Sequence, residues 1–478
     1  MSRPAAASSV RDETAVQSWL PAGLVLIALL VAAVGSLGAP LITSVAASYD
    51  VSLAAAQWTL TVTLLSGAVC TPLLGRLGTG RRRRTATLAT LTVVTAGSVG
   101  TVLSGPFALL VAGRAAQGVG LGLVPLLMAT ARDSLDERRA TSVIAMVSVA
   151  TTAAIGVGYP LTGFLADIGG VRTAYAAGLV ATAAALLVGV RVLPHHDAGA
   201  GRPPRVDWAG AVLLGLALIA VLVPLGDHDL WHRQAAVALL LLGAGVALLL
   251  VWLLVERRVA APLVDLRALR HPMVARANLA MFVGGAAMYL LLTLATRYVQ
   301  TPAAAGYGFG LDTFEAGLVL VPFSVAGFVA GRMTPRLVGR INAARTVAAS
   351  LVVVALGFVV LVVGRSTVAG PVVAVTVLGL GVGAVSAAMP AMILASTPTG
   401  QTAGAMSVNQ VVRSVGFAVG SALGGLILSA STVAGGFPER SGYVAASVVG
   451  ALLALVAAFL VTLGRPTDGA TTGRRPRS

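Results

Sequence analysis

Fourteen long apolar stretches occupy most of this 478-residue chain, and short polar segments separate them. A helix needs about 20 residues to cross the hydrocarbon core of a bilayer, which matches the length of these stretches. Lipid offers backbone amides no hydrogen-bond partner, so each stretch must form a helix that satisfies its own amides. The expected fold is therefore an all-α polytopic membrane protein with fourteen spans. They are 20–45, 58–74, 85–103, 106–129, 140–165, 173–193, 208–225, 235–255, 277–296, 315–331, 345–363, 368–394, 404–429 and 443–463.

The composition agrees with this interpretation. Hydrophobic residues make up 57% of the chain and charged residues only 10%. An ordinary soluble domain has about 25% charged residues. The length of the chain is thus taken up by spans, and several soluble domains are not expected.

The distribution of arginine predicts the orientation. All 33 basic residues are arginine, and they fall mainly in alternate connections. If the N-terminus is cytoplasmic, 26 of them lie inside and five lie outside, at positions 172, 233, 297, 365 and 440. Positive residues bias short loops toward the cytoplasm, so both termini are expected inside, in agreement with an even number of spans. The expected location is the cell membrane.

The formal net charge of +16 does not indicate a nucleic-acid partner. Nucleic-acid binding needs basic side chains gathered on one surface, where they neutralise phosphates. Here the arginines are spread over many short connections and belong to no binding motif. The run 81–84 is interpreted as a topology anchor beside anionic lipid headgroups.

Two smaller features set further bounds. Cys70 is the only cysteine and lies in an apolar stretch, so a single chain forms no disulfide. Ser44-Val45-Ala46 could mimic a signal-peptide cleavage site, but the apolar run before it is too long for an h-region of about 7–15 residues. We therefore expect the first stretch to be a true span.

The polar connections divide the chain into halves. Charged linkers at 194–207 and 256–276 bracket the seventh and eighth spans, leaving six spans on each side. The second span of each group of six ends in a similar triplet, 75–77 (Gly-Arg-Leu) and 331–333 (Gly-Arg-Met). Two six-helix repeats with a midplane site between them are a transporter architecture. The expected organisation is tail 1–19, bundle 20–193, linker and two inserted helices 194–276, bundle 277–463 and tail 464–478.

Several motifs resemble the major facilitator superfamily, and within it the fourteen-helix drug:proton antiporters of actinobacterial type. Residues 114–120 (RAAQGVG) are similar to the R-x-x-Q-G-x-G signature, and 75–82 (GRLGTGRR) to a shortened G-x-L-a-D-r-x-G-r-r loop. Asn409 with 413–416 (RSVG), and 316–318 (AGL) with Pro322, fit the fourteen-helix branch. The resemblance covers roughly 19–463. It implies gating or conformational roles for Gly75, Arg81, Arg82, Gly118, Gly120, Pro160, Gly163 and Gly416.

Three departures from the family pattern bear on mechanism. The loop motif lacks its aspartate, and Thr79 is the nearest counterpart. The antiporter motif of the fifth span is reduced to 159–164 (YPLTGF), which keeps one proline and one glycine. The first-span aspartate of the family aligns near Val31, an apolar residue. Proton coupling by the family's usual carboxylates is therefore in doubt.

The acidic residues give few candidates for a coupling group. The chain has 17 Asp and Glu, and none lies in the middle of a predicted span. The five histidines also lie in connections. A proton-coupled carrier needs a titrating group that is exposed alternately to each side. Asp312 and Glu315, at the outer end of the tenth span, come closest, and each is either a solvated span-end charge or a coupling acid.

Only two charges lie deep in the predicted spans, Arg114 and Arg413. A charge at this depth costs at least about 2.5–3.5 kcal/mol, so it should face protein or a water-filled cavity. Arg114 either braces helices through backbone carbonyls or meets a proton site or an anionic substrate, whereas Arg413 is favoured as a brace. Replacement of Arg114 by alanine is expected to abolish transport while the protein stays inserted and folded, because the change removes a cavity contact rather than core packing. Further polar residues expected at a central cavity are Gln117, Asn278, Tyr289, Asn409 and Gln410.

The residue inventory also limits the classes of function. Without lysine, the chain cannot form a P-loop ATPase site or a retinal Schiff base. No clustered carboxylates or histidines lie in the spans, so neither an enzyme, a metal site nor a cofactor is expected. The resemblance implies a secondary exporter of amphipathic small molecules, with protons as the candidate coupling ion. We expect it to act as a monomer in the bilayer. A metabolite uptake carrier and a non-transporting membrane sensor remain alternatives.

Overall fold

The computed structural model describes residues 5–37, 41–51, 53–78, 80–103, 105–194, 207–226, 228–259, 272–395, 397, 402–431 and 437–463. These residues form helices and connections, and no β-strand occurs among them. Twelve helical segments within these ranges are long and apolar enough to cross a membrane, and Trp208–Val221 is a shorter apolar helix. The expectation of an all-α polytopic protein is confirmed for the described residues. The first half of helix α7 is not among the twelve segments, so the count of fourteen spans stays a prediction.

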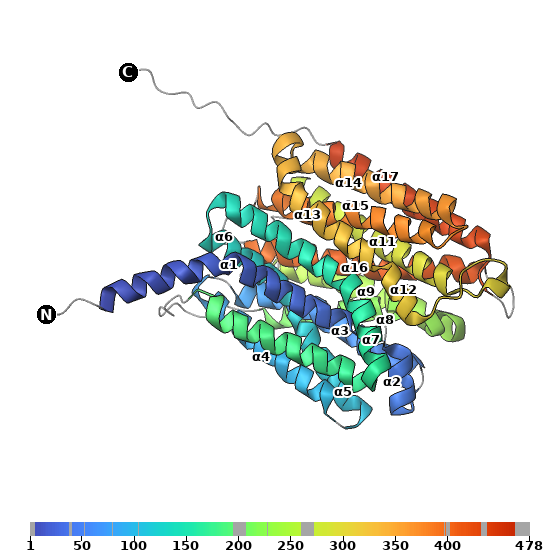
Figure 1. Cartoon of the computed structure of the whole chain (residues 1–478), viewed down its shortest axis with the longest axis horizontal. Helices are drawn as coiled ribbons and strands as arrows, with labels where there is room; N and C mark the ends of the chain where they lie inside the picture. The colour runs from blue at the N-terminus through green and yellow to red at the C-terminus, as the bar shows by residue number, and fades with distance from the viewer. Residues whose placement is uncertain are drawn as a thin grey trace, which may run out of the picture.

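The first half of the chain folds into seven α-helices, which occupy one side of the molecule in Figure 1. They are α1 (Ala5–Ser36), α2 (Ile42–Tyr49), α3 (Leu53–Leu77), α4 (Arg83–Val102), α5 (Phe107–Gly118), α6 (Leu123–Ser134) and α7 (Glu137–Val192), with 3-10 turns η1 (Gly80–Arg82) and η2 (Val119–Gly122). The predicted single run 20–45 is wrong at its end, because α1 stops at Ser36 and a separate α2 begins at Ile42. The sequence between them contains Gly38 and Pro40, the two residue types least favourable in a helix.

Helix α7 holds the predicted fifth and sixth spans in one element of 56 residues. The backbone leaves helical geometry at Gly169 (φ −143°, ψ 17°) and Gly170 (φ 74°, ψ −174°). A positive φ with this ψ is accessible essentially to glycine alone. The chain can therefore reverse direction here within two residues, between the predicted spans 140–165 and 173–193.

The second half continues with α8 to α17, which run from green to red in Figure 1. The elements are α8 (Trp208–Gly226), α9 (His228–Glu256), α11 (Pro272–Gln300), η3 (Ala303–Ala305), α12 (Thr313–Val319), α13 (Val321–Ile341), α14 (Ala343–Gly364), α15 (Ala369–Leu394), α16 (Thr402–Ala430) and α17 (Arg440–Thr462). Within this half, α14 packs on α15 and α17, and α11 packs on α16. The two halves meet where α7 contacts α13 and α15, and where α16 contacts α3 and α6. One buried cluster draws residues from both halves, including Leu24, Leu127 and Met389.

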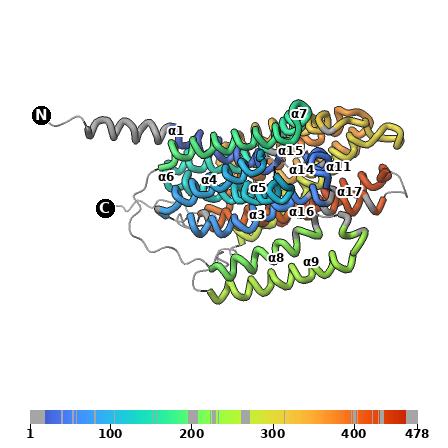
Figure 2. Tube along the Cα trace, turned by 90° about the horizontal axis from the view of Figure 1, so that it is seen from below, coloured from blue at the N-terminus to red at the C-terminus, as the bar shows by residue number. Residues whose placement is uncertain are grey.

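Helices α8 and α9 lie together along one side of the bundle, as Figure 2 shows. Leu214, Leu218 and Trp252 join a cluster with Ala68 of α3, and partly buried Val411 of α16 packs against it. Much of α9 faces outward, and apolar side chains such as that of Leu240 are exposed, as expected for a helix that faces lipid. The pair thus packs on the outside of α3 and α16. This placement accords with the expected insert at 194–276, whose boundaries remain predictions.

Small residues let α16 and α11 approach to backbone contact. A Cβ atom added at Gly416 would lie 2.3 Å from the carbonyl oxygen of Phe282, and one at Gly420 would lie 2.0 Å from that of Ala286. Such distances are far inside van der Waals contact. Gly416 and Gly420 lie four residues apart on α16, and glycine at both positions allows the close packing of membrane helices.

Candidate functional site

A cavity of about 100 Å³ lies between the two halves of the molecule. Helices α1, α3, α6 and α7 and turn η2 line it from the first half, and α11 and α16 line it from the second. Most lining residues are apolar. The residues with polar groups are Ser36, Thr151, Tyr159, Tyr289, Gln410, Arg413 and Ser414. Arg413 is the charged residue among them, and no acidic residue belongs to the described lining.

Arg413 is buried in the wall of this cavity, with 6% of its surface exposed. It lies 11 residues into α16, roughly 16 Å along the helix axis and thus deep in the predicted span. Its Nη1 and Nη2 atoms donate to the hydroxyl of Thr151 on α7, at 3.4 and 3.3 Å. Its buried Nε has no hydrogen-bond partner among the described residues. The cation is therefore held by a single neutral hydroxyl, itself shared, because Thr151 also donates to the carbonyl of Ser148.

Aromatic rings stand beside this guanidinium. The Phe417 ring, one helical turn after Arg413, lies 5.6 Å from the guanidinium carbon, within cation–π range. Tyr289 of α11 packs on Phe417 with ring centroids 4.5 Å apart. Tyr159 of α7 lines the cavity from the other half. The site thus combines one cation with aromatic and aliphatic walls, which suits an amphipathic molecule.

Arg114 lies elsewhere: it is fully buried and is not part of the cavity lining. Its Nε donates to the carbonyl of Thr59 (3.0 Å) and its Nη1 to the carbonyl of Val34 (3.0 Å). Nη2 reaches the carbonyl of Gly35 at 3.4 Å, and Nη1 also binds Gln117 Oε1 at 2.7 Å. Val34 and Gly35 belong to the last turn of α1, where carbonyls lack their usual helical donor four residues later, and the N–H of Leu37 reaches the Val34 carbonyl at 3.4 Å. Arg114 therefore caps α1 and ties it to α3 and α5, which supports the brace interpretation.

Gln117 extends this brace to α4. Its Nε2 donates to Ser98 Oγ (2.9 Å) and Thr101 Oγ1 (3.3 Å). The ring of Tyr175 faces Arg114 from α7, 5.8 Å from the guanidinium carbon. Neither Arg114 nor Gln117 contacts the cavity in this conformation, so two residues of the predicted cavity set belong instead to a buried network inside the first half.

Asn409 also lies outside the cavity lining. Its Nδ2 donates to Asn278 Oδ1 at 3.1 Å, which links α16 to α11 within the second half. The nearby Ser407 hydroxyl donates to the carbonyl of Thr71 at 3.2 Å, and this bond joins α16 to α3 across the halves. Of the polar residues predicted for a cavity, the structure thus gathers Tyr289, Gln410 and Arg413.

Asp312 and Glu315 form the N-terminal capping box of α12. Asp312 Oδ1 accepts from the backbone N–H of Glu315 (2.7 Å), and Glu315 Oε2 accepts from that of Asp312 (3.1 Å). Both residues are exposed. This arrangement satisfies two helix-end donors and explains both acids as local structural groups. It supports the span-end interpretation of the pair.

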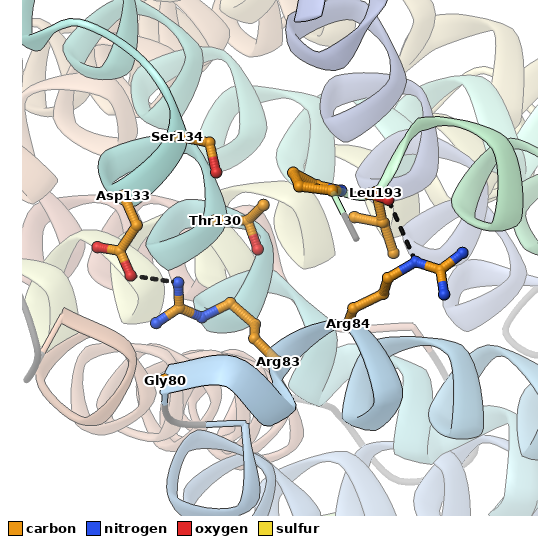
Figure 3. Close-up of a pocket in the computed structure, with 8 residues that line it drawn as sticks. Gly80, Arg83, Arg84, Thr130, Asp133, Ser134 and Leu193 are labelled. Carbon is orange, nitrogen blue, oxygen red and sulfur yellow. Dashed lines mark hydrogen bonds and ion pairs between the residues drawn. The ribbon is translucent and has the colours of Figure 1, made fainter. Parts of the chain in front are cut away.

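We call the end of the bundle at the α3–α4 and α6–α7 connections the arginine-rich end. Figure 3 shows a pocket there in which Arg83 reaches toward Asp133. The two form an ion pair that links the start of α4 to the end of α6. Arg83 also donates to the carbonyl of Ala129 at 3.2 Å. Arg84 points the other way, and its Nε donates to the carbonyl of Leu193 at 3.2 Å, just after α7.

The pairing differs from the one that the loop motif implies. The resemblance places the working arginines at positions 81 and 82, but Arg82 is exposed and the side chain of Arg81 lies outside the described residues. Arg83 is buried. Its carboxylate partner is Asp133 of α6. Position 79, where the family motif has an aspartate, is a threonine here and lies outside the described residues. Sequence reasoning missed this pair because its members are 50 residues apart.

Arg132, next to Asp133, joins the two halves at the arginine-rich end. Its Nη1 donates to Thr402 Oγ1 (3.0 Å) at the start of α16. Its Nη2 donates to the carbonyls of Leu394 (3.3 Å) and Thr397 (3.0 Å), where α15 ends. A cation beside the carbonyls at the C-terminal end of a helix is favoured by the helix dipole. We call this set of three bonds the Arg132 clamp.

Contacts between the halves also occur along α7 on either side of the cavity. A Cβ at Gly331 of α13 would lie 2.2 Å from the Val149 side chain, toward the arginine-rich end. Toward the other end, the rings of Phe164 and Phe314 lie 6.2 Å apart, and a Cβ at Gly317 would lie 3.2 Å from the Cα of Pro160. The predicted motif residue Gly163 faces Phe314 in the same region. The halves therefore contact each other on both sides of the cavity.

Tyr159, Thr151 and Phe417 are among the lining residues that were not singled out from the sequence. Two weak signals existed. Tyr159 directly precedes the motif proline at 160, and Phe417 is four residues after Arg413 on the same helix face. Thr151 carries no such signal, since threonine is common in apolar helices. Its position opposite Arg413 depends on the docking of the two halves.

Comparisons with known proteins agree with this architecture. The fold is similar to a crystal structure of the human organic anion transporter MFSD10 (TETRAN), with a TM-score of 0.66 over 93% of this chain and 99% of that one, at 16% sequence identity. The multidrug resistance protein Stp of Mycobacterium tuberculosis is 27% identical over 395 residues, which are 81% of this chain and 68% of Stp. The cephamycin export protein CmcT of Amycolatopsis lactamdurans is 32% identical over 66% of this chain and 64% of that protein.

The lincomycin resistance protein LmrB of Listeria innocua is 26% identical over 60% of this chain and 59% of LmrB. The chain thus spans about two thirds or less of the length of these curated relatives. Their names point to a transporter rather than to an enzyme. The family model of the Major Facilitator Superfamily matches residues 24–377 and 277–477. The chain therefore belongs to the Major Facilitator Superfamily.

Proposed function

We propose that this protein is a secondary active transporter of the cell membrane that exports amphipathic small molecules. The observation that carries the proposal is the cavity between the two halves, whose apolar and aromatic walls surround a few polar groups. Binding sites for small molecules commonly have this composition. Relatives named for multidrug resistance and for cephamycin export support the direction of transport.

The finer topology is part of the proposal. We infer fourteen spans, with α8 and α9 as an inserted pair between two groups of six, in the manner of the fourteen-helix branch. No described residue of α8 or α9 lines the cavity, which supports this view. The excess of arginine places the arginine-rich end and both termini in the cytoplasm. The cavity forms within one chain, so a monomer suffices for transport.

Transport requires that the cavity open to each side in turn. At the arginine-rich end, which we assign to the cytoplasm, the three bonds of the Arg132 clamp join α6 to the end of α15 and the start of α16. Opening to the cytoplasm must break these bonds, and the polar groups then meet water. Closure of the other side would rest on the contacts between α7 and α12. The two sets of contacts would alternate as the halves rock about the cavity.

Accumulation of compounds in inverted membrane vesicles tests this function. A panel of amphipathic compounds is screened with and without an imposed pH gradient. Ser414→Trp places an indole in the cavity and should abolish accumulation, whereas Val456→Trp, at an exposed apolar position on α17, should not. Stimulation by the gradient would establish proton coupling. Uptake in right-side-out vesicles alone would favour a metabolite uptake carrier, and no movement in either orientation would favour a sensor.

A further inference from the structure

Arg413 and Arg114 are both buried cations, and they differ in how their charge is compensated. Arg114 has four acceptors, three of them backbone carbonyls. Among the described residues, Arg413 has the hydroxyl of Thr151 as its one hydrogen-bond acceptor, at 3.3–3.4 Å, and its Nε has no partner. A guanidinium carries five N–H donors and stays charged at any physiological pH. Arg413 therefore presents unused donors and an uncompensated charge at the cavity wall.

The described residues supply no anion to this site. No acidic residue is part of the described cavity lining, and every acidic residue lies outside the middle of the predicted spans. The exposed pair Asp312 and Glu315 is engaged in the cap of α12. Since an unpaired charge deep in a span is costly, a bound anion would stabilise the site. The empty part of the site is adjacent to the guanidinium, because Arg413 lines the cavity.

The surroundings of Arg413 define what kind of anion fits. A carboxylate can accept two parallel N–H bonds from the edge of a guanidinium. The Nε of Arg413 is unpaired but buried in this conformation, so the edge formed by Nε and an adjacent Nη becomes available to a carboxylate when the side chain turns toward the cavity. The Phe417 and Tyr289 rings are stacked beside the cation, and aliphatic side chains such as Val31 and Leu121 complete the wall. In this conformation, the cavity of about 100 Å³ favours a body of about one aromatic ring.

Resting on the proposed transport function, we propose that the cavity is selective for amphipathic organic acids, with Arg413 binding the carboxylate and the Tyr289–Phe417 pair contacting the apolar body. The proposal gives Arg413 a direct part in substrate recognition, beyond the bracing role that the sequence favours.

A binding experiment on the purified full-length protein tests the proposal. The probes are 3-phenylpropionate and its uncharged amide, 3-phenylpropanamide, which differ in little but charge. Affinities follow from the concentration dependence of thermal stabilisation at constant ionic strength. We expect wild type to prefer the carboxylate by about ten-fold or more, the size of a charge-assisted hydrogen bond. Arg413→Gln should reduce the preference to less than about two-fold.

Two further variants keep the result interpretable. Arg340→Gln removes one positive charge from an exposed position on α13 and should preserve the preference. Arg413→Lys keeps the charge but not the planar edge, so it should retain a smaller preference for the carboxylate. It also serves as the second test if Arg413→Gln does not yield folded protein. Equal binding of acid and amide by wild type, or an unchanged preference in the folded variant at position 413, would overturn the proposal.

Transport in inverted vesicles separates this proposal from the function on which it rests. If the purified protein binds the acid through Arg413 but no compound accumulates in vesicles, the binding site stands and the transport function fails. If vesicles accumulate neutral compounds equally well with wild type and with Arg413→Gln, and the acid is not preferred, the transport function stands and acid selectivity is refuted.

Discussion

Replacing Arg114 with alanine should destabilise the protein strongly. If Arg114 faced a cavity, its loss would impair transport and leave the fold intact. The structure changes that expectation, because the guanidinium caps the end of α1 and binds α3 through backbone carbonyls. Once it is removed, the carbonyls of Val34 and Gly35 lose their guanidinium donor, and Val34 keeps the 3.4 Å bond from the N–H of Leu37.

The magnitude can be estimated from the hydrogen bonds. Arg114 makes three bonds to other helices, to Val34, Gly35 and Thr59. Interhelical bonds in membrane proteins average about 0.6 kcal/mol each, which gives about 2 kcal/mol as a lower value. Bonds to charged groups in soluble proteins contribute at least about 1.5 kcal/mol each, which gives about 4.5 kcal/mol. The free-energy cost of placing the cation in the membrane is the same when the helices are inserted but separated. It therefore largely cancels from the unfolding free energy. The expected loss is therefore about 2–5 kcal/mol of unfolding free energy.

The assay is reversible unfolding of the purified protein in mixed detergent micelles, with helix content as the signal. Arg172→Ala is the control, because Arg172 is an exposed arginine in the same half, and its loss should cost less than about 0.5 kcal/mol. Arg114→Lys should fall between alanine and wild type, since lysine keeps the charge but reaches fewer carbonyls. A loss below about 1 kcal/mol for Arg114→Ala, together with abolished transport, would refute the brace and restore a direct transport role.

Three more predictions follow from particular contacts. Gly420→Ala should destabilise the protein by about 1–3 kcal/mol, because the new Cβ would meet the carbonyl of Ala286. Gly243→Ala on α9 is the control: no atom lies within 4 Å of the new Cβ, so this change should be neutral in the same unfolding assay. Arg132→Ala should increase hydrogen–deuterium exchange at the start of α16 and leave α14 unchanged; equal exchange would argue against the clamp. Glu315→Gln should leave vesicle transport at the wild-type rate, because Glu315 serves the cap of α12, and a loss of gradient-driven transport would instead make it the coupling acid.

Features that depend on local hydrophobicity could be predicted from the sequence. The apolar stretches appear as helices because each segment must satisfy its own amides in lipid, whichever neighbours it has. Errors occurred where local backbone chemistry interrupts hydrophobicity: α1 ends at Ser36 before Gly38 and Pro40, although the apolar run continues. At Gly169 and Gly170, by contrast, two spans that were predicted separately belong to one helical element, and only two residues leave helical geometry between them.

The candidate site was predicted only in part. Both deep arginines were identified, because a charge in an apolar stretch is rare and costly. Which of them faces the cavity could not be predicted, because their environments depend on distant segments. Arg114 meets carbonyls that lie 79 and 80 residues away in the chain, and Arg413 meets Thr151 at a separation of 262 residues. The sequence predicted cavity positions for both arginines, and of the two the described cavity lining includes Arg413.

By itself, the sequence determined that this chain is helical, lies in a membrane and has its charges concentrated in the connections. Hydropathy and charge act on each segment separately, so they can be read without knowing the fold. The tertiary structure decided which charges are compensated and which are not. Arg83 is paired because α6 brings Asp133 to it, Arg114 is paired because α1 ends beside it, and Arg413 faces the cavity because the two halves dock around it. These outcomes depend on helix packing between segments far apart in the chain, which no local pattern specifies.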